Sequence, residues 1–128
     1  MKALVIDDSR TMRRIVARAL EDLGFEPPLQ AEHGRDALDQ LEAGAEVDLA
    51  CIDWNMPVMD GLTFVSQVRA NPAWRHITLM MVTTEAEHGQ IVRALAAGAH
   101  EYLIKPFTTD AIRDKLDLLG LVPAEEHV

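Results

Sequence analysis

The sequence has a single cysteine, which excludes a disulfide framework within the chain. Cys51 lies inside an apolar run, where we expect a small buried hydrophobic side chain. Histidines and cysteines with the spacing of a zinc site are also lacking. No apolar stretch approaches the length of about 18 residues that suggests a membrane-spanning helix, and the N-terminus shows no signal-peptide pattern. We therefore expect a cytoplasmic protein with no membrane insertion.

Positive charge is in short supply. Twelve lysines and arginines face 21 aspartates and glutamates, giving a formal net charge of -9. This balance argues against binding to the phosphate backbone of a nucleic acid. The chain has 128 residues, 48% of them hydrophobic, with no repeat, low-complexity segment or linker. These features predict one globular domain over residues 1–128.

Short apolar runs alternate with helical patterns along the chain. The predicted strands are 3–6, 25–32, 47–53, 77–82 and 102–104, and the predicted helices are 10–23, 35–43, 62–70, 85–97 and a last one capped by Thr108 or Thr109. This alternation predicts a single doubly wound α/β fold, with a five-stranded parallel sheet and helices on both faces. Pro27 and Pro28 remove two backbone donors, so the second strand is expected at a sheet edge.

Helical spacing indicates which side chains point inward. Ile15 is among the apolar residues expected on the buried side of the first helix, and the fourth helix should bury parts of Ile91, Val92 and Leu95. Four arginines, at positions 10, 13, 14 and 18, occupy the rest of the first helix. They could form an anion site, but we favour a solvated face.

Polar residues follow four of the predicted strands: Asp7, Asp8, Asp53, Thr83, Thr84 and Lys105. Because the carboxyl ends of parallel strands meet at one edge of the sheet, these side chains should lie together, where open α/β sheets place their chemistry. The three carboxylates would repel one another unless a cation were present. Hard oxygen ligands with room for water favour Mg²⁺ over Zn²⁺.

Such a site could transfer a phosphoryl group. Asp53 would be the nucleophile that forms an aspartyl phosphate, with Lys105 and the Thr83 hydroxyl contacting the phosphoryl oxygens. Each residue also has a simpler interpretation. The pair at positions 7 and 8 could only cap a helix, Lys105 could be a surface charge, and Thr83 could bond its own backbone. Their joint placement favours the functional interpretation.

Several motifs together resemble those of response-regulator receiver domains, particularly the chemotaxis members. They are VIDDS at 5–9, TMRRIV at 11–16, DWNMP at 53–57, MDG at 59–61, MVT at 81–83 and KPFT at 105–108. The resemblance spans Leu4 to about Leu119. It implies the flavodoxin-like strand order 2-1-3-4-5, and a cis peptide bond before Pro106.

The resemblance also implies roles for the site residues. Asp53 matches the phosphorylated aspartate, Asp8 a direct Mg²⁺ ligand, Asp7 an acid acting through metal-bound water, and Asn55 a residue whose backbone carbonyl binds the metal. Lys105 matches the lysine that pairs with the phosphoryl group. The remaining implied roles are a switch pair, Thr83 and Tyr102, and two positions that tune hydrolysis of the acyl phosphate, Asn55 and Glu85.

The function implied is that of a monomeric, single-domain response regulator in a two-component phosphorelay. A histidine kinase would phosphorylate it, and a protein partner such as a flagellar motor switch protein would read the altered surface. The implied output face comprises Ile91, Leu95, Tyr102, Ile104 and Lys115. Glu87 and His88 depart from the lysines that chemotaxis members carry there, which weakens the match to a motor partner.

Three alternatives remain. The chain could be a receiver that serves as a phosphate sink or as a cell-cycle or stress adaptor. It could be an aspartyl-phosphate phosphatase of the haloacid dehalogenase type, although its adjacent acids lack the Asp-x-Asp pattern after the first strand. It could be a flavodoxin-like redox carrier, although two acids would repel the cofactor phosphate. The receiver interpretation predicts no enzyme activity beyond phosphoryl transfer to the chain itself and its dephosphorylation.

Overall fold

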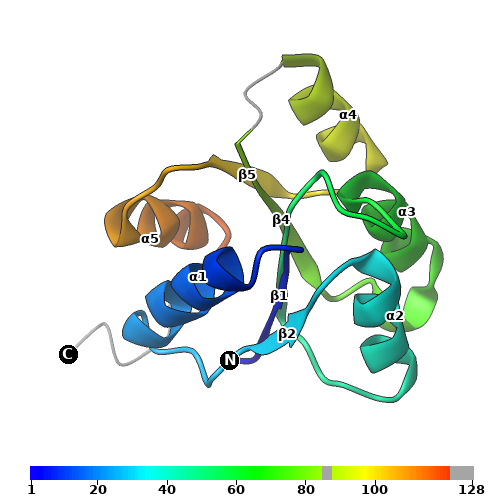
Figure 1. Cartoon of the computed structure of the whole chain (residues 1–128), viewed down its shortest axis with the longest axis horizontal. Coiled ribbons are helices and arrows are strands. Elements are labelled where there is room, and N and C mark those ends of the chain that lie inside the picture. Colours follow the sequence, from blue (N-terminus) through cyan, green and yellow to red (C-terminus); the bar gives the residue numbers. More distant parts are fainter. Residues whose placement is uncertain (85–87, 122–128) are drawn as a thin grey trace.

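The computed structural model describes residues 1–84 and 88–121. Strands and helices alternate along these ranges (Figure 1): β1 (Ala3–Ile6), α1 (Arg10–Asp22), β2 (Leu29–Ala31), α2 (Gly34–Glu42), β3 (Leu49–Ile52), α3 (Gly61–Ala70), the short 3₁₀ helix η1 (Pro72–Trp74), β4 (Thr78–Thr83), α4 (His88–Ala97), β5 (Glu101–Ile104) and α5 (Thr109–Leu118). Within these ranges every helix is too short or too polar to traverse a bilayer. The element order confirms the predicted α/β alternation.

The strands form one parallel sheet in the order β2-β1-β3-β4-β5. This is the order that the family resemblance implied. β2 lies at an edge, as its two prolines predicted, but it is shorter than the predicted strand 25–32. Only Leu29–Ala31 pair with β1. The strand starts only at Leu29 because Pro27 and Pro28 have no backbone N–H to donate to the neighbouring strand.

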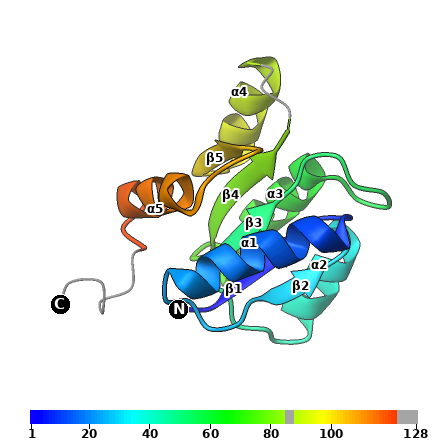
Figure 2. The ribbon, with the colours of Figure 1, turned by 60° about the vertical axis from the view of Figure 1, so that its left-hand side comes forward.

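Two hydrophobic cores lie on opposite faces of the sheet. In β1, Leu4 and Ile6 pack toward α2, α3 and α4, whereas Ala3 and Val5 pack toward α1 and α5. Figures 1 and 2 show the same division, with α1 and α5 together on one face. Since successive strand residues point to opposite faces, burial on both sides explains the uninterrupted apolar runs in the sequence.

Side-chain caps fix where the helices begin. The Ser9 Oγ accepts a hydrogen bond from the Met12 N–H at 3.2 Å, which confirms the predicted start of α1. Thr108, rather than Thr109, caps α5, and its Oγ1 accepts from the Ala111 N–H at 3.1 Å. Both caps lie just beyond the carboxyl end of a strand, so they place the start of each helix at the edge that carries the polar residues.

Two side chains that were predicted to be at least partly buried are largely exposed. Ile15 of α1 is 48% exposed and Val92 of α4 is 61% exposed, whereas Leu95, at 40%, is partly covered and lies on the predicted output face. In their place α4 buries Ala94, which is 1% exposed. A small residue at the contact lets the helix backbone approach its neighbours closely, and it turns the larger side chains outward. Apolar periodicity alone could not reveal this rotation of the helix.

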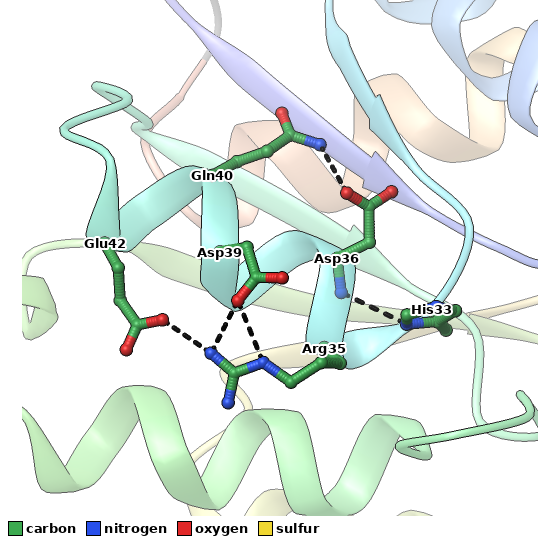
Figure 3. Close-up of polar contacts among 6 residues, drawn as sticks. All are labelled: His33, Arg35, Asp36, Asp39, Gln40 and Glu42. Atoms are coloured by element: carbon green, nitrogen blue, oxygen red, sulfur yellow. Dashed lines mark hydrogen bonds and ion pairs between the residues drawn. The ribbon is translucent and has the colours of Figure 1, made fainter.

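The outer surface of α2 carries a network of polar contacts (Figure 3). Arg35 donates from Nε and Nη2 to one oxygen of Asp39, at 3.0 and 2.8 Å, and from Nη2 to Glu42. At the start of the helix, Nδ1 of His33 accepts a hydrogen bond from the Asp36 N–H. The ion pairs are exposed, so they contribute little to stability individually. They link successive turns of α2 along its exposed side.

Val58, in the loop between β3 and α3, has an unusual backbone. Its φ angle is +67°, and its side chain is 77% exposed. A left-handed conformation costs an L-residue about 1–2 kcal/mol, and a β-branched side chain is especially poorly suited to it. Asparagine visits this region far more readily. The fold therefore holds Val58 under local backbone strain.

We predict that Val58→Asn stabilises the protein, because asparagine fits the left-handed conformation. The free energy of unfolding should rise by roughly 0.5–1.5 kcal/mol, measured by urea denaturation. Val58→Thr is the matched control, since it adds polarity but keeps the β-branch. It should stay within about 0.5 kcal/mol of wild type. An equal gain from both variants would attribute the effect to polarity and refute the role of strain.

Candidate functional site

The strand register brings three carboxylates together at the carboxyl edge of the sheet. Ile6 of β1 lies opposite Ile52 of β3, so the residues that follow, Asp7 and Asp53, leave the sheet side by side. Asp8 completes the group. Each of the three acids offers a carboxylate oxygen, and these oxygens all lie within 4.8 Å of one another. The structure thus assembles the acid cluster that the sequence predicted.

A lysine from the far edge of the sheet lies against this cluster. Nζ of Lys105, just after β5, is 2.7 Å from Oδ2 of Asp7 and 3.7 Å from Oδ1 of Asp53. The Lys105 and Asp7 side chains are only 8% and 5% exposed. A buried pair of this kind is tolerated because each charge compensates the other. The peptide bond between Lys105 and Pro106 is cis, as the resemblance implied.

Further hydrogen bonds hold Asp7 in place. Its Oδ1 accepts a hydrogen bond from the Ser9 N–H at 2.9 Å, while Oδ2 faces Lys105. Its backbone N–H donates to the Ala31 carbonyl of β2 at 3.1 Å. Asp7 therefore connects the edge strand, the start of α1 and the lysine, and both of its carboxylate oxygens are engaged.

Asp53 is an acid of the cluster whose pKa is raised above its ordinary value. Burial raises its pKa to about 6, Lys105 opposes this increase, and Asp7 adds to it. Its Oδ1 also accepts a hydrogen bond from the Trp54 N–H at 2.9 Å. The side chain is 14% exposed, so it remains reachable from solvent. A partly desolvated carboxylate in an accessible position is well suited to nucleophilic attack.

The donor set fits a hard divalent cation. All three acids offer oxygen, and no cysteine or histidine joins them in the described part of the chain. Mg²⁺ prefers carboxylate oxygens together with several water molecules, and Asp8 is exposed on the open side of the cluster. Asn55 is exposed in the adjoining loop, where the resemblance gave its carbonyl a ligand role.

The loop that holds Asp53 returns tightly against it. A Cβ atom at Gly61 would lie 2.3 Å from the Asp53 carbonyl oxygen, so this position has no space for a side chain. The Gly61 N–H donates to the Trp54 carbonyl at 2.9 Å and closes the loop. Gly61 therefore allows α3 to begin directly beside the acid cluster.

Thr83 lies at the last position of β4, next to this group. It is 5% exposed, and its carbonyl accepts a hydrogen bond from the Lys105 N–H at 2.8 Å. Tyr102 of β5 pairs with Met81 of β4, two residues earlier than Thr83. Thr83 and Tyr102 both line one small cavity beneath α4. The predicted switch pair therefore shares a space, although Tyr102 does not touch the acid cluster.

The remaining predicted residues lie on or near α4, β5 and α5. Ile91, Ile104 and Tyr102 are half-buried, while Leu95 is exposed. Nζ of Lys115 is 3.1 Å from Oε1 of Glu101 and 4.6 Å from the centre of the Tyr102 ring. Glu85 and Glu87 lie outside the described residues, as does the side chain of His88.

Sequence reasoning missed the role of Arg13. It was placed on a solvated face, but it is 8% exposed, and its Nη1 donates to the Asp7 carbonyl at 2.7 Å. Its Nε donates to Oε1 of Gln30 in β2 at 3.2 Å. The helical spacing offered a signal, since Arg13 lies three and four residues before the buried Val16 and Ala17. Through its hydrogen bond to the Asp7 carbonyl, Arg13 helps to fix the backbone of the acid cluster.

Comparison with known proteins gives a consistent result. The family described as response regulator receiver domain matches residues 3–117. Chemotaxis protein CheY1 of Helicobacter pylori is 44% identical over 93% of this chain and 96% of its own length. Chemotaxis protein CheY of Pseudomonas aeruginosa is 42% identical over 91% of this chain and 94% of its own.

Solved structures show the same likeness. The structure of Vibrio cholerae chemotaxis protein CheY4 superposes with a TM-score of 0.83 at 35% identity, covering 91% of this chain and 96% of that one. A response regulator from Chloroflexus aurantiacus gives a TM-score of 0.83 at 27% identity, over 93% and 97%.

We predict that Asp53→Asn stabilises the metal-free protein at pH 7, because it removes a desolvated carboxylate that Asp7 repels. The folded-state pKa of about 6 exceeds the unfolded value of 3.8, so wild type loses stability as the pH rises between them. The gain should be roughly 1–3 kcal/mol at neutral pH and should vanish near pH 4, measured by urea denaturation with a chelator present.

The matched control is Asp117→Asn, an exposed change on α5 that should leave the pH profile unaltered. A destabilised Asp53→Asn protein at pH 7 would instead mean that attraction to Lys105 outweighs burial and repulsion.

Proposed function

The chain belongs to the response regulator receiver family, and from this we propose that it is a CheY-like signalling switch, phosphorylated on Asp53 and acting in chemotaxis. The observation that carries the proposal is the site itself. One accessible, partly desolvated carboxylate lies beside two further acids and a buried lysine. This arrangement suits a nucleophile that accepts a group carrying negative charge.

The proposed chemistry is phosphoryl transfer from an acyl phosphate or from a phosphohistidine of a kinase. An Asp53 oxygen forms a bond to phosphorus while the bond to the donor oxygen or nitrogen breaks, and the donor leaves with its electron pair. Lys105 donates a hydrogen bond to the transferred group, and its charge offsets the added negative charge. Mg²⁺ held by Asp7, Asp8, Asp53 and the Asn55 carbonyl would supply further positive charge.

The proposed output follows from Thr83. Its hydroxyl would turn toward the phosphoryl oxygens and vacate space that the Tyr102 ring can enter, which alters the surface of α4, β5 and α5. The exposed Val92 and Leu95 give that surface an apolar component. A protein partner would distinguish the two states through this surface, and a flagellar motor switch protein is the candidate that the relatives suggest.

One observation favours the alternative of a phosphate sink. The Lys115 ammonium is paired with Glu101 at 3.1 Å and lies over the Tyr102 ring, so an acidic partner peptide would have to compete with this pair. The sequence also has Glu87 where chemotaxis members carry a lysine, which lowers the positive charge available to an acidic segment. A sink would need only the phosphorylation chemistry and no output partner.

We predict that wild type incubated with acetyl phosphate and Mg²⁺ gains one phosphoryl group, whereas Asp53→Asn gains none. Intact-mass spectrometry measures the gain, and the group should be labile at high pH, as an acyl phosphate is. The control is Asp117→Asn, which should be labelled like wild type because its carboxylate is exposed on α5. Equal labelling of Asp53→Asn and wild type would refute the assignment.

We also predict that Mg²⁺ stabilises the protein, because it relieves repulsion among the acids. At concentrations well above its dissociation constant it should raise the melting temperature by a few degrees, or roughly 1–2 kcal/mol. The fluorescence of Trp54, which adjoins Asp53, should follow the same titration. Asp8→Asn should raise the Mg²⁺ concentration needed for half of each response at least tenfold. Asp22→Asn, a change at the end of α1, should leave that concentration unaltered. Unchanged responses in Asp8→Asn would exclude this metal site.

A further inference from the structure

A small cavity lies between the start of α4 and strands β4 and β5. The residues that line it are Trp54, Met81, Thr83, Gln90, Ile91, Ala94 and Tyr102. Its walls are almost entirely apolar, and the space holds no more than about one water molecule. The cavity connects Thr83, beside the acid cluster, with Tyr102 on the edge strand.

One polar atom in this apolar setting is unsatisfied. Oε1 of Gln90, in the first turns of α4, is buried and accepts no hydrogen bond from any part of the described chain. Buried carbonyl oxygens are nearly always paired, so a lone one requires an explanation. An acceptor that is unpaired in one conformation is available to a donor that arrives in another.

Tyr102 is the neighbouring donor with freedom to move. It lies half-buried on the edge strand, and within the described ranges its hydroxyl makes no hydrogen bond to the protein. Its ring is held from outside by Lys115, 4.6 Å from the ring centre. The other side-chain donors around the cavity are less free, because Trp54 is part of the buried core and Thr83, at the end of β4, is only 5% exposed.

We propose that Gln90 is the acceptor for the Tyr102 hydroxyl when the ring turns into the cavity, and that Gln90 thereby sets how much of the inward state is populated. This inference rests on the proposed function, because phosphorylation is what draws Thr83 away. The cavity is too small for the ring until Thr83 gives way. A hydrogen bond formed only in the inward state favours that state over the outward one.

Gln90 is in this sense a positioning residue. It touches neither the acids nor the phosphoryl group, and it acts through Tyr102. Its removal should leave the acid cluster unchanged, and it should not destabilise the resting protein, since an unsatisfied buried oxygen is lost. The effect should be confined to the balance between the two ring positions. By linkage, the same balance contributes to the affinity for a phosphoryl mimic.

The sequence makes a direct test possible, because Tyr102 is the chain's only tyrosine. Protein grown with a fluorinated tyrosine gives one fluorine NMR signal set, recorded with Mg²⁺ and with or without beryllofluoride as the phosphoryl mimic. In wild type the mimic should shift the population toward the inward signal. In Gln90→Met, which keeps the length but removes the acceptor, the inward-to-outward ratio should fall about three- to tenfold.

Two controls separate this role from a merely structural one. Gln67→Met makes the same change at an exposed position of α3 and should behave as wild type. In a Tyr102→Phe background, Gln90→Met should no longer weaken beryllofluoride affinity, measured by Trp54 fluorescence, because the donor is already absent. An effect of the same size with and without the tyrosine hydroxyl would overturn the inference.

The remaining outcomes separate the two proposals. If wild type binds the mimic but Gln90→Met keeps the wild-type ratio, or if the fluorine signal never changes, the inference about Gln90 is wrong and the proposed function is unaffected. If wild type takes up neither beryllofluoride nor a phosphoryl group, the proposed function fails, and the inward state that the inference requires fails with it.

Discussion

The arrangement of the polar residues at the carboxyl edge of the sheet depends on one balance of charges. Three carboxylates repel one another there, and the positive charge of the buried Lys105 offsets part of that repulsion. Asp7, Asp8 and Asp53 come together because adjacent parallel strands end at the same level, and this proximity would be unfavourable without compensation. Lys105, which follows the strand at the far edge of the sheet, provides this compensating charge. Hydrogen bonds from the Arg13 side chain and the Ser9 N–H hold Asp7 beside its neighbours.

Most of the fold and the acid cluster could be predicted from the sequence, because both depend on regular patterns. Apolar runs ending in Asp7, Asp53 and Lys105 predict buried parallel strands, and parallel strands bring their carboxyl ends together. What could not be predicted depends on helix rotation and on contacts distant in sequence. The exposure of Val92 follows from Ala94 making the close contact, and the burial of Arg13 follows from the position of Gln30 on another strand.

The same helix rotation links the site to the surface. Because the small Ala94 makes the buried contact of α4, Val92 and Leu95 face outward, whereas Ile91 and Gln90 line the cavity beside Tyr102. The imperfect packing beneath α4 is therefore part of how a change at Thr83 could reach the outer face.

The pairing of Lys105 with Asp7 spans 98 residues of sequence. Lys105 is residue 105 of 128, so during synthesis the acids leave the ribosome well before their counter-charge. Parallel pairing between β1 and β3 is itself non-local and slow to form. The acid cluster together with its counter-charge is consequently a property of the folded chain. On the proposed function, a chain made only as far as β4 would lack the lysine that offsets the charge of the transferred phosphoryl group.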